Sequence, residues 1–297
     1  GEALFDCFPD RKILGGAPLN LIVHVNRLIA GVGGQGVMVS RVGDDDLGRR
    51  IVEELDSRDV PTTCLQIDPE RQTGTVKVTV SEDGQPQYEI VEAVAWDHLA
   101  FDDSLESLAA NCHAVCFGTL AQRNSVSRST IQRFVKLATG AVRILDVNLR
   151  QEYYTPEILI ESFKLASVVK INLEELQHVG RLLAEHVQWR DDVDDLAREF
   201  IKNYDLDLLA LTRGSQGTVL YTADEVTNAD PVSLEPQPGA DSVGAGDACC
   251  AGVIYGLLMA WPLQRTVRLA NRMGAFVASR PGATPHLPDD FLESALD

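Results

Sequence analysis

The sequence predicts an α/β fold in which a doubly wound, mostly parallel sheet is flanked by helices and joined by a small antiparallel β lid. From residue 97 onward, helical segments alternate with short apolar segments, a pattern typical of a parallel sheet. Residues 73–95 instead alternate polar and apolar side chains about a turn at Asp83-Gly84, which indicates an exposed hairpin. A glycine-rich octet, residues 241–248, directly precedes a long apolar helix that ends near Trp261.

The predicted strands and helices follow from these patterns. We expect the end of a strand at residues 1–6, a helix from Pro18 to about Ile29, a strand at Val37–Ser40 and a helix that ends near Arg58. The later strands are Ala114–Phe117, Arg143–Arg150, Ser167–Asn172 and Leu208–Thr212, and the later helices are Ser104–Asn111, Ser129–Thr139, 156–166, one beginning at Leu173, and Asp191–Tyr204.

Composition narrows the function classes. The chain of 297 residues is long enough for one large α/β domain, and its formal net charge of −18 argues against a nucleic-acid surface. No apolar run is long enough to cross a membrane. The six cysteines show no C-x-x-C pair, so we expect reduced thiols and a cytoplasmic location. Because the first residue is Gly1 rather than Met, we expect a few residues upstream of it.

The octet has the chemistry of an anion site. Gly244 and Gly246 lie at the first turn of the helix, where backbone N–H groups lack helical partners and the helix dipole favours an anion. Asp247 places a carboxylate beside that anion. An anion cradle next to a proton acceptor is what phosphoryl transfer to a hydroxyl requires.

Polar residues also follow the predicted strands at their carboxyl ends, where ligands of doubly wound sheets collect. Any one of them could be a capping residue, but together they indicate a site. Arg150 offers positive charge there, or else pairs with Glu152. The groups are Asp6, Gly118-Thr119, Asp146-x-Asn148-x-Arg150, Asn172-x-x-Glu175 and Thr212-x-Gly214-x-x-Gly217.

Two other patterns in the sequence are rejected as functional sites, and the absence of a third excludes a class of kinases. Residues 31–36 match the dinucleotide pattern G-x-G-x-x-G, but a helix precedes them and a strand follows, which is the wrong order. Cys112, His113 and Cys116 have no second ligand pair, so a metal site there is not expected. The P-loop motif is absent from the sequence, which excludes the P-loop kinases.

The octet resembles the Asp-Thr-x-Gly-Ala-Gly-Asp signature of the pfkB carbohydrate kinases, the ribokinase-like sugar kinases. Residues 15–20, Gly-Gly-Ala-Pro-Leu-Asn, resemble the N-terminal sugar-binding signature of the same family. Residues 172–175 and 212–217 resemble its N-x-x-E and T-x-G-x-x-G motifs. The resemblance implies a single sugar-kinase domain over 1–297, with lid strands at about 73–95 and in part of 4–16, and a homodimer formed through the lid.

The resemblance also implies a role for each site residue. Asp247 is the base, and Gly244, Ala245 and Gly246 form the anion hole. ATP and Mg²⁺ are the cofactors, with Glu175 holding Mg²⁺ through water and Asp241 marking a candidate site for K⁺. The sugar-binding residues are Asp6, Gly15, Gly16, Asn20, Gly43, Asp44, Thr119 and Arg150, and the nucleotide-binding residues are Asn172, Glu175, Thr212, Gly214, Gly217 and Asn271.

Residues 117–123 and 146–150 look most like fructokinase-type members, so fructose is the expected substrate. The 2-keto-3-deoxygluconate kinases and ribokinase share much of the pattern and stay open as alternatives. A sugar or nucleotide sensor on the same fold is an alternative of another class, although a sensor could dispense with Asp247. A dinucleotide-dependent dehydrogenase would depend on residues 31–36 alone.

Overall fold

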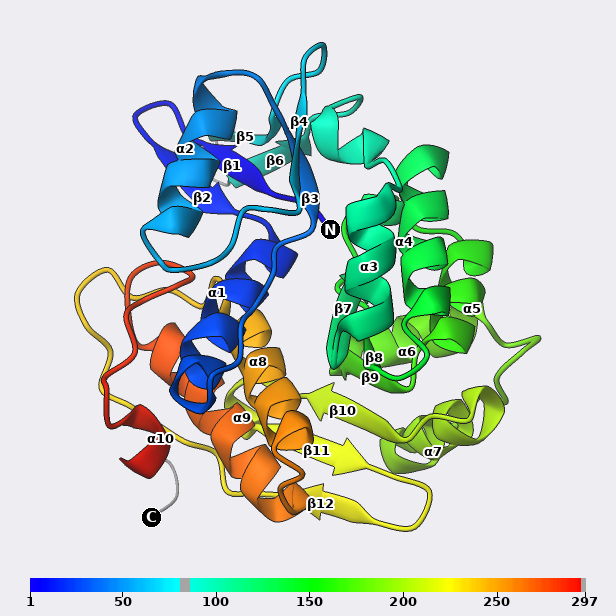
Figure 1. The fold of residues 1–297 in the computed structure, drawn as a ribbon. Helices are drawn as coiled ribbons and strands as arrows, with labels where there is room; N and C mark the ends of the chain where they lie inside the picture. The colour runs from blue at the N-terminus through cyan, green and yellow to red at the C-terminus, as the bar shows by residue number, and fades with distance from the viewer. Residues whose placement is uncertain (81–85, 295–297) are drawn as a thin grey trace.

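The computed structural model describes residues 1–80 and 86–294, and a six-stranded sheet lies at its centre (Figure 1). The sheet has the order β12–β11–β10–β9–β8–β7. Strands β7 to β10 run parallel, as predicted, while β11 and β12 add an antiparallel edge that the sequence patterns did not reveal. The strands are β7 (Ala114–Gly118), β8 (Val142–Asp146), β9 (Val168–Asn172), β10 (Leu208–Thr212), β11 (Thr218–Tyr221) and β12 (Val226–Asn228).

Helices cover both faces of this sheet. Because successive side chains of a strand point to opposite faces, Ile144 packs in one core and its neighbour Leu145 in the other. The first core lies under α1 (Ala17–Ile29), α8 (Ala245–Leu258) and α9 (Leu263–Ala278). The second core lies under α4 (Ser125–Leu137), α5 (Pro156–Leu165), α6 (Leu173–Leu182) and α7 (Val193–Tyr204). The sheet is therefore doubly wound.

Side-chain caps fix where these helices begin. Asn124 accepts a hydrogen bond from the N–H of Val126, so α4 begins four residues before the predicted Ser129. Thr155, Asn172 and Asp192 cap α5, α6 and α7 in the same way. The remaining helices are α2 (Asp46–Asp56), α3 (Asp103–Asn111) and α10 (Phe291–Ser294).

Helix α8 is buried on all sides and packs closely on α9. A methyl group at Gly252 would lie 2.8 Å from the Cα atom of Ala270, and one at Gly256 would collide with Thr266. The two glycines therefore let the helix backbones approach each other. This agrees with the buried apolar helix predicted after the octet.

The predicted lid is a separate four-stranded sheet in the order β2–β1–β5–β6, at the top of Figure 1. β1 pairs antiparallel with β2 and parallel with β5, and β5 forms the hairpin with β6. The predicted turn at Asp83-Gly84 lies outside the described residues. The lid strands are β1 (Leu4–Cys7), β2 (Lys12–Gly15), β5 (Gly74–Val80) and β6 (Pro86–Ile90).

A third, two-stranded sheet joins β3 (Ser40–Gly43) to β4 (Leu65–Asp68) in parallel. The prediction of a strand at Val37–Ser40 was wrong except for Ser40, since residues 37–39 are outside the strands. These residues have the apolar character of a strand, but in the described part of the chain no neighbouring strand pairs with them.

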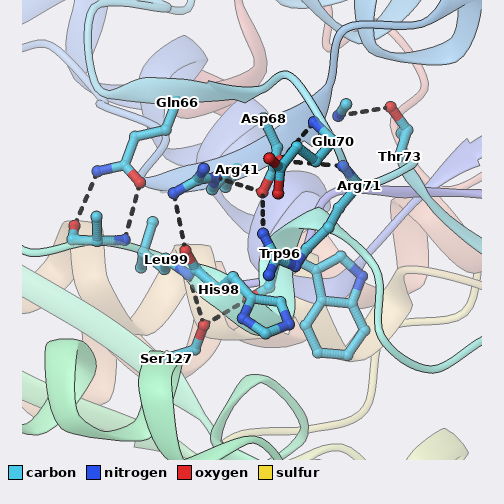
Figure 2. Close-up of polar contacts among 12 residues, drawn as sticks. Arg41, Gln66, Asp68, Glu70, Arg71, Thr73, Trp96, His98, Leu99 and Ser127 are labelled. Atoms are coloured by element: carbon cyan, nitrogen blue, oxygen red, sulfur yellow. Dashed lines mark hydrogen bonds and ion pairs between the residues drawn. The ribbon is translucent and has the colours of Figure 1, made fainter.

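Polar contacts clamp this small sheet to the segment that follows the lid (Figure 2). The guanidinium of Arg41 lies 2.9 Å from the Asp68 carboxylate and donates to the His98 carbonyl at 3.0 Å. Gln66 exchanges two hydrogen bonds with the backbone of Ala100, at 2.8 and 2.9 Å. The β3–β4 sheet is thereby held at a fixed position beside the main sheet.

The predicted strand Arg143–Arg150 is shorter than expected. It ends at Asp146, because Asn148 and Gln151 have positive φ angles of 38° and 47°, which a strand does not allow. The chain turns at this point, across the carboxyl edge of the sheet.

Candidate active site

The N-terminus of α8 presents free backbone donors. Gly244 precedes the helix with φ 77°, and a methyl group there would approach the Ala283 carbonyl oxygen to 2.6 Å, so the turn requires glycine. No side chain caps the helix, and within residues 1–80 and 86–294 the N–H groups of Gly246 and Asp247 have no acceptor. Two N–H groups at the positive end of the helix dipole can therefore bind an anion.

Asp247, the third residue of α8, is only 8% exposed beside these donors. The amide nitrogen of Asn20, on the first turns of α1, donates a hydrogen bond of 2.9 Å to its carboxylate. Burial raises the pKa of Asp247 to about 7, and the charge of Asp146 acts in the same direction. Lys170, Asn20 and Arg150 oppose this rise. A carboxylate with a pKa near 7 is suited to accept a proton at neutral pH.

A buried ion pair lies directly under the glycine turn. The Lys170 ammonium is 2.9 and 3.2 Å from the two oxygens of Asp146, which faces it in register across β8 and β9. Burial alone would lower the pKa of Lys170, but the charges of Asp146 and Asp247 outweigh burial, so the pKa is raised. A methyl group at Gly246 would lie 3.2 Å from the Lys170 nitrogen. A permanent cation therefore lies against the anion cradle.

Lys170 was not among the predicted site residues. Its signal in the sequence is a single charged residue inside an otherwise apolar, buried strand, and such a residue needs a charged partner. That partner, Asp146, was recognised only as a polar strand end.

The Asp6 carboxylate lies between β1 and the Gly15-Gly16 turn. A methyl group at Gly15 would be 2.9 Å from an Asp6 oxygen, so the glycine leaves this carboxylate accessible. Gly16 has φ 106° and lies against the Glu2 carbonyl, where only glycine fits before α1 begins. Burial raises the pKa of Asp6, and the charge of Arg150 opposes the rise.

Arg150 is exposed, and its guanidinium donates to the Leu149 carbonyl at 3.0 Å. Its charge lowers the pKa of Asp247 as well as that of Asp6, so it lies within electrostatic reach of both carboxylates. In the described part of the chain it forms no ion pair with Glu152, which was the alternative considered from sequence.

Gly43 lies beside the lid, where its N–H donates to the Thr73 hydroxyl at 2.9 Å. Asp44, in contrast, is exposed and pairs with Arg49 at 3.3 Å. Thr119 is buried and donates its hydroxyl proton to the Val147 carbonyl at 3.0 Å. All three of these predicted sugar-binding residues therefore have partners within the protein.

Asn172 and Glu175 cap α6 reciprocally. The Asn172 side chain accepts from the N–H of Glu175 at 2.8 Å, and Glu175 accepts from the N–H groups of Asn172 and Leu149 at 3.0 and 2.9 Å. Each carboxylate oxygen thus has one protein donor and keeps further acceptor capacity. This arrangement fits contact with Mg²⁺ through water, because Mg²⁺ retains several of its waters.

The predicted nucleotide loop follows β10, whose last residue, Thr212, is paired with Asn172 of β9. Gly214 and Gly217 both have positive φ angles, 55° and 81°. A methyl group at Gly217 would lie 2.9 Å from the Asn271 amide nitrogen, so the loop contacts α9 closely. The Asn271 side-chain oxygen is buried and lacks a partner among the described residues, which leaves one acceptor available there.

Asp241 is exposed, and its carboxylate accepts the N–H of Val243 at 2.9 Å before the glycine turn. Across residues 1–80 and 86–294, no three His, Cys, Asp or Glu side chains are grouped as metal ligands. Among the same residues, no helix combines the length and apolar character needed to span a membrane.

The model of the pfkB family carbohydrate kinases matches residues 7–290. The chain belongs to the pfkB family. This pfkB kinase is 29% identical to a fructokinase of Escherichia coli, over 97% of this chain and 94% of the relative. It is 28% identical to a fructokinase of Vibrio alginolyticus, over 97% of this chain and 94% of that protein. The pfkB kinase is thus a phosphotransferase that acts on a sugar hydroxyl.

Solved structures agree with this assignment. A Vibrio cholerae fructokinase bound to fructose, ADP and calcium has a TM-score of 0.80 at 25% identity, with 100% of this chain and 97% of that chain covered. An uncharacterized sugar kinase of Pyrococcus horikoshii has a TM-score of 0.79 at 26% identity, over 96% and 93% of the two chains. The pfkB kinase therefore shares its whole architecture with sugar kinases.

Proposed function

We propose that this pfkB kinase transfers the γ-phosphate of ATP to the primary hydroxyl of fructose, giving fructose 6-phosphate. The observation that carries the proposal is Asp247, a buried carboxylate with a pKa near 7 beside two free backbone donors. The fructokinase relatives support the choice of sugar, as does the Vibrio cholerae structure that contains fructose and ADP.

In the proposed mechanism, the fructose hydroxyl lies at the Asp247 carboxylate, whose orientation the hydrogen bond from Asn20 fixes. Asp247 accepts the hydroxyl proton while the oxygen attacks the γ-phosphorus in line. The N–H groups of Gly246 and Asp247 stabilise the negative charge that develops on the phosphoryl oxygens. Lys170, held by Asp146, adds a fixed positive charge beneath them. Asp6, at the lid, binds the sugar.

Two ions belong to the proposal. Asn172 and Glu175 would hold Mg²⁺ through water, and the ion would supply positive charge to offset that of the ATP phosphates. Asp241 is our candidate for a K⁺ site, supported by a related fructokinase structure that contains potassium.

A homodimer contact through the lid is also part of the proposal. It is supported by two exposed apolar side chains on the lid strands, Ile13 on β2 (39% exposed) and Tyr88 on β6 (54% exposed).

The pH dependence of the reaction tests the role of Asp247. Since its pKa is raised to about 7, the carboxyl group is protonated and inactive as a base below that pH and ionised above it. We therefore expect kcat/KM to rise about tenfold per pH unit up to pH 7 and to level off above it. Removing the opposing hydrogen bond in Asn20→Ala should move this rise to higher pH. A rise centred near pH 4 in both proteins would contradict the assignment.

The choice of fructose is tested by ADP release with MgATP against fructose, 2-keto-3-deoxygluconate, ribose, glucose, tagatose and adenosine. We expect the highest kcat/KM with fructose, at least about tenfold above the next compound, since pocket contacts commonly discriminate by that factor. Preference for 2-keto-3-deoxygluconate or ribose would replace fructose but keep the kinase. ATP binding without turnover of any sugar would instead favour a sensor.

A further inference from the structure

Arg123 is buried where the main sheet meets the lid. It follows the short 3₁₀ helix Leu120–Gln122, beyond the carboxyl end of β7, and its side chain is 6% exposed. We propose that Arg123 is a positioning residue that holds the lid on the main sheet and thereby sets the affinity for the sugar. The inference rests on the proposed function, in which Asp6 of the lid binds the sugar. Arg123 and its partners, which we call the Arg123 clamp, include Asp97, Val91, Trp96 and Tyr153.

One side of the clamp is the segment between the lid and α3. Nε and Nη2 of Arg123 donate to the two carboxylate oxygens of Asp97, each at 2.8 Å, so the ion pair is bidentate. Ser127 of α4 fixes this segment, since its hydroxyl donates to the Trp96 carbonyl at 2.7 Å and accepts the N–H of Leu99 at 2.8 Å (Figure 2). Asp97 is therefore a fixed anchor for the guanidinium.

The other side of the clamp is the end of lid strand β6. Nη2 of Arg123 also donates to the carbonyl oxygen of Val91, one residue after β6 ends, at 2.6 Å. The N–H of Val91 donates to the Thr75 carbonyl of β5 at 3.0 Å, and β5 pairs with β1, the strand that contains Asp6. Because hydrogen bonds join β6, β5 and β1, a movement of this end of β6 would move the Asp6 carboxylate with it.

Two aromatic rings fix the orientation of the guanidinium. Its central carbon lies 4.0 Å from the centre of the Trp96 ring and 4.7 Å from the centre of the Tyr153 ring. A planar guanidinium stacks on aromatic faces in a way that a lysine ammonium does not reproduce. Trp96 also borders the lid, since a methyl group at Gly74, the first residue of β5, would collide with its indole.

Through Tyr153, the clamp includes the segment that follows β8. The Tyr153 hydroxyl donates to the Glu92 carboxylate at 2.9 Å, and the side-chain amide of Gln151 donates to the Tyr88 carbonyl of β6 at 2.8 Å. Arg150, one of the predicted sugar-binding residues, belongs to the same segment. The Arg123 clamp therefore holds two sides of the proposed sugar site together, the lid and the segment that contains Arg150.

This arrangement predicts which kinetic constant depends on Arg123. The apparent affinity for a ligand falls with the fraction of the protein that is in the binding conformation. A loosened lid lowers this fraction for the sugar, while saturating sugar restores it, so the KM for the sugar changes and kcat does not. The predicted nucleotide loop follows β10, which β9 and β8 separate from β7. The KM for MgATP should therefore be unaffected.

The test replaces Arg123 by lysine, which keeps a charge for Asp97 but cannot bind both Asp97 oxygens and the Val91 carbonyl. We expect the KM for fructose to rise at least about tenfold, the effect of losing one hydrogen bond to a charged group, with kcat and the KM for MgATP within about twofold of wild type. If the wild type prefers another sugar, that sugar replaces fructose, so failure of the proposed substrate stays distinct from failure of the clamp. An unchanged KM for the sugar, or an equal rise in both KM values, would overturn the proposal.

Arg133→Lys is the matched control. Arg133 of α4 also lies over an aromatic ring, that of Phe101 at 3.9 Å, and pairs with Glu106 at 3.8 Å. It is exposed, however, and joins α4 to α3 rather than to the lid. We expect this variant to keep the KM of the wild type for the sugar. The same rise in KM as in Arg123→Lys would show that the lid contacts are not the cause, and would overturn the proposal.

Two further measurements distinguish the clamp from a general loss of stability. Tyr153→Phe keeps the ring over Arg123 but removes the hydrogen bond to Glu92, and should raise the KM for the sugar by about threefold. In Arg123→Lys, hydrogen exchange should become faster for the amide protons of β6 and stay unchanged for those of β9. Exchange that is unchanged in β6, or faster in both strands, would contradict the role of Arg123 in holding the lid.

Discussion

Asp247→Asn lowers kcat by about 10²–10⁴-fold, the usual contribution of a positioned general base, and leaves the fold intact. Asn has nearly the same shape and can keep a contact with Asn20, but it cannot accept the hydroxyl proton. Since the Asp247 carboxylate is buried and its pKa is raised, a neutral side chain costs little stability there. Steady-state kcat with fructose and MgATP, together with Tm, measures both effects.

Asp195→Asn is the matched control. Asp195 is also the third residue of its helix, α7, but it is exposed and far from the octet in sequence. We expect this variant to keep the kcat and Tm of the wild type. If Asp247→Asn retained kcat within about threefold while Asp195→Asn behaved as expected, the base would have to be another residue.

Lys170→Met destabilises the protein by about 3–5 kcal/mol, because it leaves the Asp146 carboxylate buried without its partner. The variant also removes a positive charge that lowers the pKa of Asp247. The rise of kcat/KM with pH should therefore move above pH 7. Urea unfolding measures the first effect, and the pH profile the second.

Two further variants test whether the uncompensated Asp146 charge, rather than the loss of any lysine, causes the destabilisation by Lys170→Met. Lys164→Met removes an exposed ion pair with Glu161, at 3.0 Å, and should cost less than about 1 kcal/mol. Asp146→Asn combined with Lys170→Met removes both buried charges and should recover part of the lost stability. If the double variant were as unstable as the sum of the single variants, the uncompensated charge would not be the cause.

The parts of the fold that depend on local patterns could be predicted from sequence. The strands at β9 and β10, the lid hairpin and the helix after the octet all appear where the periodicity of apolar residues indicates. The predictions were wrong where the structure of a segment depends on a neighbour that is distant in the sequence. Residues 37–39 have the sequence of a strand, yet a strand needs an adjacent partner, and periodicity does not report partners.

The candidate site likewise combines features that local sequence patterns indicate with features that depend on residues distant in the sequence. The glycines and Asp247 were recognisable because a helix N-terminus with this composition has its own chemistry. The pairing of Asn20 with Asp247 spans 227 positions, and the contact of Lys170 with Asp146 depends on the register of two strands. The sequence separation of these residues does not indicate that they are in contact. The position of Lys170 beneath the N-terminus of α8 was therefore recognised only from the structure.

The close contact between α8 and α9 has a mechanical consequence for the base. Gly252 and Gly256 follow Asp247 by five and nine positions, or about 8 and 14 Å along the same helix. A side chain at Gly252 would meet the backbone of α9 and one at Gly256 would meet the Thr266 side chain, so we expect α8 to shift and its N-terminal turn to move with it. The position of the Asp247 carboxylate therefore depends on how closely α8 packs against α9 about two turns further along the helix.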